Sequence, residues 1–270
     1  MGDLTLVLEA STGTGSLALV QGRVVIAESQ VAMRGHDGER LMPALVQLLG
    51  DARVTTTALA RIARIACGGG PGGFTSLRIA AAIAKGLAGS LGVELWAVSS
   101  LALLAAGDSA LGETADIADI ADTANTANAG DAANAANAAD TGAPGDGASA
   151  SAPPAQVIAI LDALRGEWYA QRFTRDTLGA IVTAGEPALL GRDDLTALAA
   201  ATGARIVGMG GDSFPGGRLV APLARDLVRL STGPLLAHVP LAEWEPDYGR
   251  LAEAQVKWEK AHGRALGASS

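Results

Sequence analysis

A cluster of glycines is the part of this sequence whose spacing could do chemistry. Gly68, Gly70 and Gly73 match the pattern G-x-G-x-x-G. The pattern lies between a run typical of a strand and a run typical of a helix, which is where backbone N–H groups bind the phosphates of a dinucleotide. Pro71, however, removes one N–H donor from the loop. Glu94, about twenty positions later, begins the next predicted strand, whereas a ribose-binding acid ends one. The spacing therefore disfavours a dinucleotide site.

Other residues that could do chemistry are scattered along the chain. The sequence has no P-loop pattern G-x-x-x-x-G-K-[ST], no G-x-S-x-G elbow and no H-E-x-x-H pair. His36, His238 and His262 lie far apart, and the lone cysteine, Cys67, cannot form an internal disulfide. A single thiol at the end of a strand is typical of a small core residue. We therefore expect no metal ion and no cofactor.

The composition favours a soluble protein of the cytoplasm without membrane contact. Hydrophobic residues make up 49% of the chain and the mean hydropathy is +0.28, but alanine and glycine account for these values. No run of about 18 bulky apolar residues is present. The opening residues, MGDLTLVLEA, lack the basic region and the cleavage site of a signal peptide.

The acidic residues are concentrated in one segment. Residues 107–155 hold eight of the 28 acidic residues and no lysine or arginine. The rest of the chain therefore has 20 acidic and 20 basic residues. A near-neutral remainder disfavours RNA binding by the chain alone. The same segment repeats Ala, Asp, Asn and Thr, and it cannot bury enough apolar surface to offset the entropy of ordering. We expect a disordered insertion over 107–155, between a lobe of residues 1–106 and a second lobe of residues 156–270.

The apolar runs predict strands and helices in a repeated order. In the first lobe we expect strands near 4–10, 16–20 and 24–31, a helix near 36–51, a strand near 63–67, a helix after the glycines, a strand near 93–98 and a helix near 99–107. In the second lobe we expect strands near 157–162, 167–174 and 178–184, a helix near 192–201, a strand near 204–209 and a short helix near 223–230. In both lobes an apolar strand ends in an acid, and a turn with glycine follows. The order indicates an internal duplication.

The helix that follows the glycines is built from very small residues. Thr75 or Ser76 can cap its first turn, and apolar side chains from Leu77 onward lie on more than one of its sides. Small residues let a neighbouring backbone approach closely. The helix is therefore either buried in the core of the chain or packed against a partner helix. Arg78 and Lys85 lie on one side of it, which indicates a surface that reaches water or a polar partner.

The stretch GGGPGGFTSLRIAAAIAKGLA resembles the signature GPGSFTGLRIGxxxAKGLA of the TsaB (YeaZ) family. Three further stretches, RGHDGERLMPAL, AILDALRGEWYAQRF and EPDYGRLAEAQVKW, are similar to segments of the same family in the same order. The resemblance and the duplication imply an α/β fold of the actin-like class (ASKHA, RNase H-like), with duplicated ββ-βαβα lobes whose mixed sheets are flanked by helices. The residues of the signature loop are Gly70, Pro71, Gly72, Gly73, Phe74, Thr75 and Arg78.

This resemblance implies a scaffold subunit without catalytic residues of its own. Members of the family pair with TsaD, the ATPase TsaE docks on the pair, and the complex transfers threonylcarbamoyl to adenosine 37 of tRNA. The chain would meet tRNA only through that complex, and a homodimer is the alternative pairing. The glycines would then set a tight turn into a helix that packs on a partner helix, with phosphate binding ranked second. Through the first two helices, the interface would draw on Leu41, Leu45, Leu48, Leu49, Leu77, Ile79, Ile83 and Leu87.

The sequence departs from the family at the turn where actin-like ATPases hold magnesium. Glu9 and Ala10 stand where the family usually has Asp-Thr. Glutamate extends its carboxylate one methylene further, which makes an ATP site less favourable. Residual phosphate-type turns are therefore assigned to Glu9, Ser11, Thr12 and Asp162. The alternative function is an actin-like phosphotransferase that uses these residues around ATP and magnesium. A peptidase ranks last because the sequence has no Ser/His/Asp or metal constellation.

Overall fold

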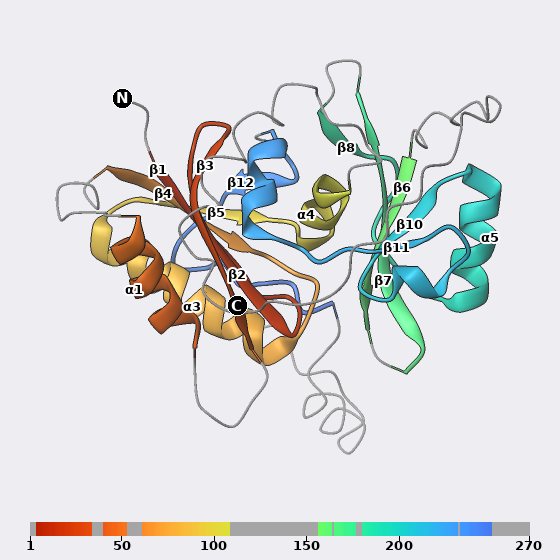
Figure 1. Cartoon of the computed structure of the whole chain (residues 1–270), viewed down its shortest axis with the longest axis horizontal. Helices are drawn as coiled ribbons and strands as arrows, with labels where there is room; N and C mark the ends of the chain where they lie inside the picture. The colour runs from red at the N-terminus through yellow and green to blue at the C-terminus, as the bar shows by residue number, and fades with distance from the viewer. Residues whose placement is uncertain are drawn as a thin grey trace, which may run out of the picture.

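The apolar runs of the first lobe, with one short strand from near the carboxyl end of the described residues, form a six-stranded mixed sheet (Figure 1). The computed structural model describes residues 4–33, 40–52, 61–108, 156–163, 165–176, 180–231 and 233–249. Strands β1, β2 and β3 form an antiparallel meander at one side of the sheet. Strand β4 runs parallel to β1, and β5 runs parallel to β4. The strands, in their order across the sheet, are β12 (Leu236–His238), β5 (Glu94–Val98), β4 (Ile62–Gly68), β1 (Leu4–Glu9), β2 (Thr14–Gln21) and β3 (Val24–Ala32).

Two helices pack on the outer face of this sheet. They are α1 (Leu41–Asp51) and α3 (Phe74–Leu91), which lie side by side (Figure 1). Pro43 lies in the first turn of α1, and the expected start of this helix near residue 36 lies outside the described residues. The predicted cap of α3 was wrong. Gly73 occupies the N-cap position, where its N–H donates to the carbonyl of Ser11, and α3 therefore begins at Phe74, two residues before the start that a Thr75 cap would give. No helix in the described part of the chain is long and apolar enough to cross a membrane.

A third helix, α4 (Ser100–Gly107), lies between the two lobes (Figure 1). Its residues SLALLAAG are apolar on nearly every side, and all of them except Gly107 are buried. A helix that is apolar all round must be covered on all sides. The inner face of the first sheet covers one side of α4, and the second sheet covers the other, so that Val7 and Phe173 belong to one continuous core. The lobes are therefore joined by a shared hydrophobic core.

The second lobe repeats the arrangement on a smaller scale. Its central order β10-β6-β7-β8 corresponds to β4-β1-β2-β3 of the first lobe, which confirms the predicted duplication and the α/β class. Helix α5 (Arg192–Thr202) covers the outer face of the sheet through Leu195. The strand β9 was not predicted. The strands are β6 (Gln156–Asp162), β7 (Glu167–Arg175), β8 (Ile181–Thr183), β9 (Ala188–Gly191), β10 (Arg205–Gly208) and β11 (Arg218–Leu219), and a short 3-10 helix, η2, spans Gly211–Ser213.

The chain then returns to the first lobe. The 3-10 helix η3 (Ala224–Arg229) packs on β2, where the N–H of Ala224 donates to Ser16 Oγ at 3.0 Å, and β12 joins the first sheet beside β5. We expected residues 156–270 to form the second lobe, so the structure differs from that boundary after β11. The expected insertion lies outside the described residues from 109 to 155, as do residues 250–270.

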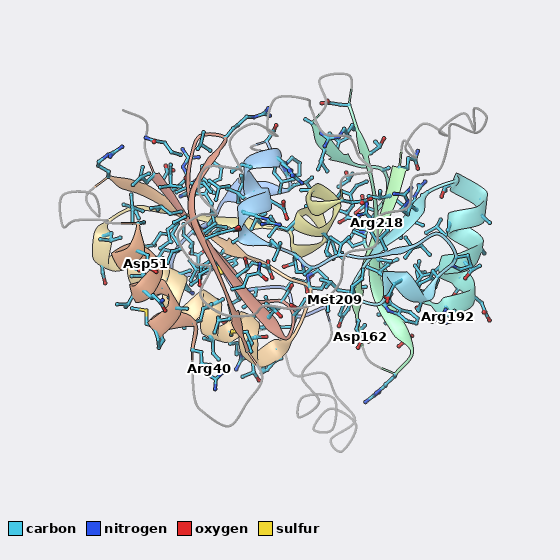
Figure 2. The ribbon with its side chains drawn as sticks, in the orientation of Figure 1. Arg40, Asp51, Asp162, Arg192, Met209 and Arg218 are labelled. Atoms are coloured by element: carbon cyan, nitrogen blue, oxygen red, sulfur yellow. The ribbon has the colours of Figure 1, made fainter. Side chains whose placement is uncertain are left out.

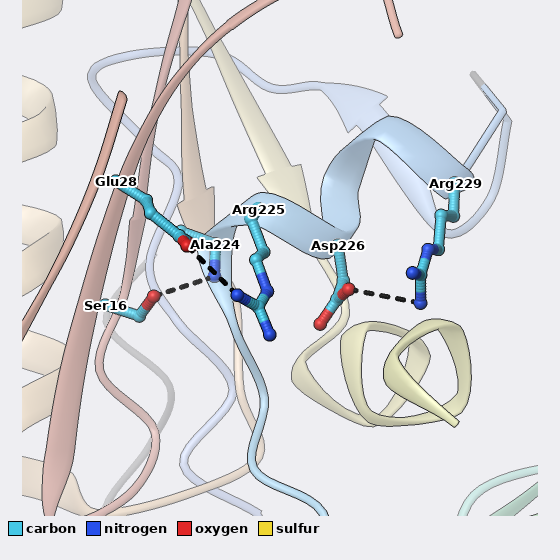
Figure 3. Close-up of polar contacts among 6 residues, drawn as sticks. All are labelled: Ser16, Glu28, Ala224, Arg225, Asp226 and Arg229. Carbon is cyan, nitrogen blue, oxygen red and sulfur yellow. Dashed lines mark hydrogen bonds and ion pairs between the residues drawn. The ribbon is translucent and has the colours of Figure 1, made fainter. Parts of the chain in front are cut away.

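Charged residues hold η3 at the junction of the lobes (Figure 3). Arg225 donates to Glu28 of β3 at 3.0 Å, and Arg229 contacts Asp226 at 3.4 Å. Arg229 also donates to the carbonyl of Ala106 at the end of α4. Burial of Asp226 raises the pKa of its carboxyl from the usual 3.8 to about 6, although the two arginines oppose the shift. The ionised form of Asp226 is therefore disfavoured in the folded protein.

Replacing Asp226 by asparagine should change how stability depends on pH. Because the folded-state pKa lies above the unfolded value, this residue stabilises the fold below about pH 4 and loses that contribution as the pH rises towards about 6. The loss amounts to about 3 kcal/mol at most. Urea unfolding of wild type and Asp226→Asn from pH 4 to pH 8 measures it, and the wild type should lose more stability than the variant. The exposed Asp212→Asn is the control. Equal slopes for all three proteins would show that Asp226 does not carry this dependence.

Candidate functional site

The glycine loop is enclosed by the backbone of its own chain. The N–H of Gly69 donates to the carbonyl of Val98 at 2.7 Å, and the N–H of Gly73 donates to the carbonyl of Ser11 at 2.7 Å. In turn, the carbonyl of Gly69 accepts from the N–H of Asp247 at 2.8 Å. The N–H groups of Gly69 and Gly73 are thus bonded within the protein. In a phosphate-binding loop, such groups would instead point towards the ligand.

Close approach explains two of the glycines. Gly70 has φ of 89°, and a Cβ at this position would overlap the carbonyl oxygen of Asp247. A Cβ at Gly72 would overlap the backbone of Ser11. The loop therefore packs between the first turn of the chain and the segment around Asp247. Both contacts bring together segments that are distant in the sequence.

The Glu9 carboxylate lies beneath this loop and is completely buried. It accepts a hydrogen bond from the Ser11 N–H at 2.5 Å and another from Ser100 Oγ at 2.9 Å. A Cβ at Gly68 would overlap it. Burial raises the pKa of the Glu9 carboxyl above its usual value, and the bonds from Ser11 and Ser100 oppose that shift. Glu9 thus links β1, β4 and α4, and solvent does not reach it in this conformation.

The other predicted phosphate-type residues lie in different surroundings. Ser11 is buried beside Glu9, whereas Thr12 is half-buried and its Oγ1 bonds within its own turn, to the N–H and the carbonyl of Thr14. Asp162 is exposed at the end of β6 in the second lobe, where it pairs in register with Trp168 (Figure 2). The structure therefore does not gather the four residues into one exposed polar site.

Four of the predicted interface residues lie inside the chain. Leu41, Leu45, Leu48 and Leu77 are at most 3% exposed. The first three belong to the core between the first sheet and its helices. This corrects their assignment to an outer surface. Their spacing marks an apolar helix face but not what that face packs against, and the chain's own sheet covers it. The remaining four lie at the edge of that core and are half-buried: Leu49, Ile79, Ile83 and Leu87.

The outward side of the two helices carries residues that the sequence interpretation missed. Met42 and Val46 of α1 are 40% and 60% exposed. Ala82 and Gly86 of α3 are also exposed, and nothing lies within 4 Å of a Cβ built at Gly86. Their spacing of four places Ala82 and Gly86 on one side of the helix, a signal that was readable in the sequence. We call the surface formed by Met42, Val46, Ile79, Ala82, Ile83 and Gly86 the α1–α3 face.

A carboxyl-terminal segment, residues 240–249, runs along α3 beside the α1–α3 face. We call it the strap. Lys85 Nζ donates to the carbonyls of Ala242 and Trp244 at 3.3 and 2.9 Å, and a Cβ at Gly89 would lie 3.5 Å from Leu241. Lys85 therefore holds the strap. Of the two basic residues predicted to reach a partner, this one is used within the chain.

Arg78, at the start of α3, lies against the end of the strap. Its Nε donates to the Tyr248 hydroxyl at 3.3 Å, and its guanidinium carbon lies 4.1 Å from the centre of the Phe74 ring. The backbone of Tyr248 reaches the second lobe as well, because the Tyr169 hydroxyl donates to its carbonyl at 3.3 Å. The strap thus contacts both lobes and borders the α1–α3 face on the side of Arg78.

Comparison with known proteins identifies relatives of the chain. A family model described as TsaD, tRNA N6-adenosine threonylcarbamoyltransferase, matches residues 25–126. The tRNA threonylcarbamoyladenosine biosynthesis protein TsaB of Bacillus subtilis is 38% identical over 101 residues, which cover 37% of this chain and 43% of that protein. The matched stretch is thus similar to proteins named TsaB. TsaB of Haemophilus influenzae is 32% identical over 106 residues, or 39% of this chain and 43% of the relative. The matched stretch spans less than half the length of these curated relatives.

Solved structures support the fold over nearly the whole chain. An uncharacterized protein with similarity to peptidase YEAZ from Pseudomonas aeruginosa superposes with a TM-score of 0.65 at 24% identity, covering 92% of this chain and all of that one. YeaZ from Pseudomonas aeruginosa gives a TM-score of 0.60 at 22% identity, covering 91% and 99%. These similarities confirm the predicted actin-like fold.

Proposed function

We propose that this chain is the non-catalytic partner subunit of the bacterial machinery that makes threonylcarbamoyladenosine at position 37 of tRNA. In this role it pairs with TsaD through the α1–α3 face and supports the transfer of threonylcarbamoyl by TsaD. The similarity to proteins named TsaB is the observation that carries the proposal. The match of residues 25–126 to a TsaD family model fits a chain that works beside TsaD.

The chemistry of the α1–α3 face supports the pairing. Its residues are apolar or small and none is charged, and the cores of protein interfaces are depleted of charged residues. Gly86 leaves room for a partner backbone to approach the α3 axis closely. A lasting complex buries more than about 1,000 Å², and two adjacent helices present a surface that can contribute to such an area. A homodimer would use the same face, so it would compete with the pairing to TsaD.

The surroundings of Glu9 support the non-catalytic part of the proposal. A magnesium ion bound to nucleotide needs carboxylate oxygens that a solvated ion can reach. Glu9 is buried, and its oxygens accept bonds from Ser11 and Ser100. The nucleotide chemistry of the proposed complex therefore belongs to its other subunits, TsaD and the docked ATPase TsaE, and the chain meets tRNA only within that complex in the cytoplasm.

Reconstitution tests this function. Purified TsaD and the other components from the same organism should form threonylcarbamoyladenosine in unmodified tRNA when this chain is present and at least tenfold more slowly when it is omitted. The chain alone should form none. Full modification without the chain would overturn the proposal. A rise in the melting temperature of the isolated chain with ATP and magnesium would also contradict it, because a ligand that binds only the folded state must stabilise that state.

A further inference from the structure

The strongest feature outside the α1–α3 face is an exposed cluster of one arginine and two aromatic rings. Arg78 and Phe74 come from the first turns of α3, and Tyr248 comes from the strap. The centres of the Phe74 and Tyr248 rings are 4.7 Å apart. The guanidinium carbon of Arg78 lies 4.1 Å from the centre of the Phe74 ring and 5.4 Å from the centre of the Tyr248 ring. Two rings and the bond from Nε to the Tyr248 hydroxyl therefore fix the arginine. A side chain held in this way loses little entropy when it binds a partner.

The hydrogen-bonding capacity of Arg78 is mostly unused. Within the described part of the chain only its Nε makes a hydrogen bond, so its two terminal nitrogens donate to no protein group there. Arg192 is a useful contrast. It also lies over two rings, those of Trp168 and Phe214, but both of its terminal nitrogens donate to Ser213. Arg192 is thus satisfied within its own lobe, whereas Arg78 presents an open fork of donors.

The geometry of a guanidinium fork selects an anion of a particular shape. Its paired N–H groups match the two oxygens of a carboxylate in a bidentate contact. Arg78 lies four residues before Ala82, so the two share one side of α3. A protein that covers Ala82 and Gly86 therefore reaches Arg78 as well. Arginine and tyrosine are also the residue types that dominate the energetics of protein interfaces.

We infer that Arg78, held by Phe74 and Tyr248, is the polar anchor of the partner interface and binds an aspartate or glutamate carboxylate of the protein that covers the α1–α3 face. The inference rests on the proposed function, because it names the chemistry of one contact in that pairing. The strap then has a role in binding as well as in folding, since it supplies one of the two rings that orient the anchor.

The affinity of TsaD for variants of this chain tests the anchor by titration calorimetry. Arg78→Met keeps much of the apolar stem and should weaken binding by about 10- to 100-fold, the usual loss for a charge-assisted contact. Arg78→Lys should restore little of it, because lysine cannot form the bidentate contact. Arg192→Met is the matched control and should bind like wild type. Wild-type binding should weaken with added salt more steeply than binding of Arg78→Met.

The outcomes separate this inference from the proposed function. Unchanged affinity of Arg78→Met, with wild-type binding intact, would overturn the anchor and leave the pairing standing. Equal salt dependence of wild type and Arg78→Met would overturn it too. A charged contact in the interface makes binding weaken with salt, whereas a purely structural role of Arg78 would not. If tRNA, titrated into the assembled complex, lost affinity for Arg78→Met while TsaD did not, the anion would be an RNA phosphate and the carboxylate assignment would be wrong. Absence of wild-type binding would instead contradict the proposed function.

Discussion

Replacing Gly70 by alanine should lower the free energy of unfolding by more than about 3 kcal/mol, because two penalties act at one residue. Gly70 has φ of 89°, which L-residues with a side chain rarely adopt. The added Cβ would also overlap the backbone carbonyl of Asp247, and that carbonyl cannot move without detaching the strap from the glycine loop. Urea unfolding followed by circular dichroism measures the loss.

A matched control uses another glycine. Gly86 lies in a helix, has no strained φ, and has nothing within 4 Å of a built Cβ. Gly86→Ala should therefore stabilise the isolated chain by about 0.5 to 1 kcal/mol, since alanine favours the helix. If Gly70→Ala were as stable as wild type, the conclusion that the glycine loop packs closely on the strap would be wrong.

Replacing Ala82 by glutamate should weaken pairing with TsaD by at least about 100-fold, because the complex would bury an unpaired charge in an apolar interface. Ala82 is exposed in the isolated chain, so its stability should change by less than about 0.5 kcal/mol. Ile83, which the sequence also suggests, is a poorer choice because its side chain contacts the chain's own core. Calorimetric titration with TsaD measures the effect.

The control for this variant is Ala197→Glu. Ala197 is an exposed alanine on α5, in the second lobe, so it matches the chemistry of the change at a distant place. It should bind TsaD like wild type. Equal affinity of the two variants, with both proteins folded, would show that the α1–α3 face is not the interface.

Much of the fold follows from local patterns. Strands such as β1 and β6 were predictable because they are short apolar runs bounded by turns, and α4 was predictable as a helix from the apolar run that begins at Leu101. Its position between the two sheets was not predicted. An apolar pattern indicates that a helix is buried, but it does not identify the elements that pack against it. The return of η3 and β12 to the first lobe was missed for the same reason, since no local signal states which sheet a short strand joins.

The candidate site was harder to predict than the fold. The spacing of Leu41, Leu45 and Leu48 marks an apolar face correctly, but that face packs on the chain's own sheet. The exposed residues lie on the opposite side. The spacing of Ala82 and Gly86 was readable in the sequence, but these residues are too small to mark a hydrophobic face. The strap is invisible to local patterns, because Lys85 and Trp244 meet across 159 positions of sequence. Contacts of this kind arise only from the folded chain.

Pairing of this chain with TsaD through the α1–α3 face is the central claim, and light scattering coupled to size-exclusion chromatography tests it most directly. The chain has a mass of 26.9 kDa. An equimolar mixture with TsaD of the same organism, at micromolar concentration, should elute as a single species whose mass is the sum of one copy of each protein. Any homodimer of the chain should convert into that species, and Ala82→Glu should prevent its formation. Separate peaks with the masses of the two free proteins, while TsaD is folded, would contradict the account.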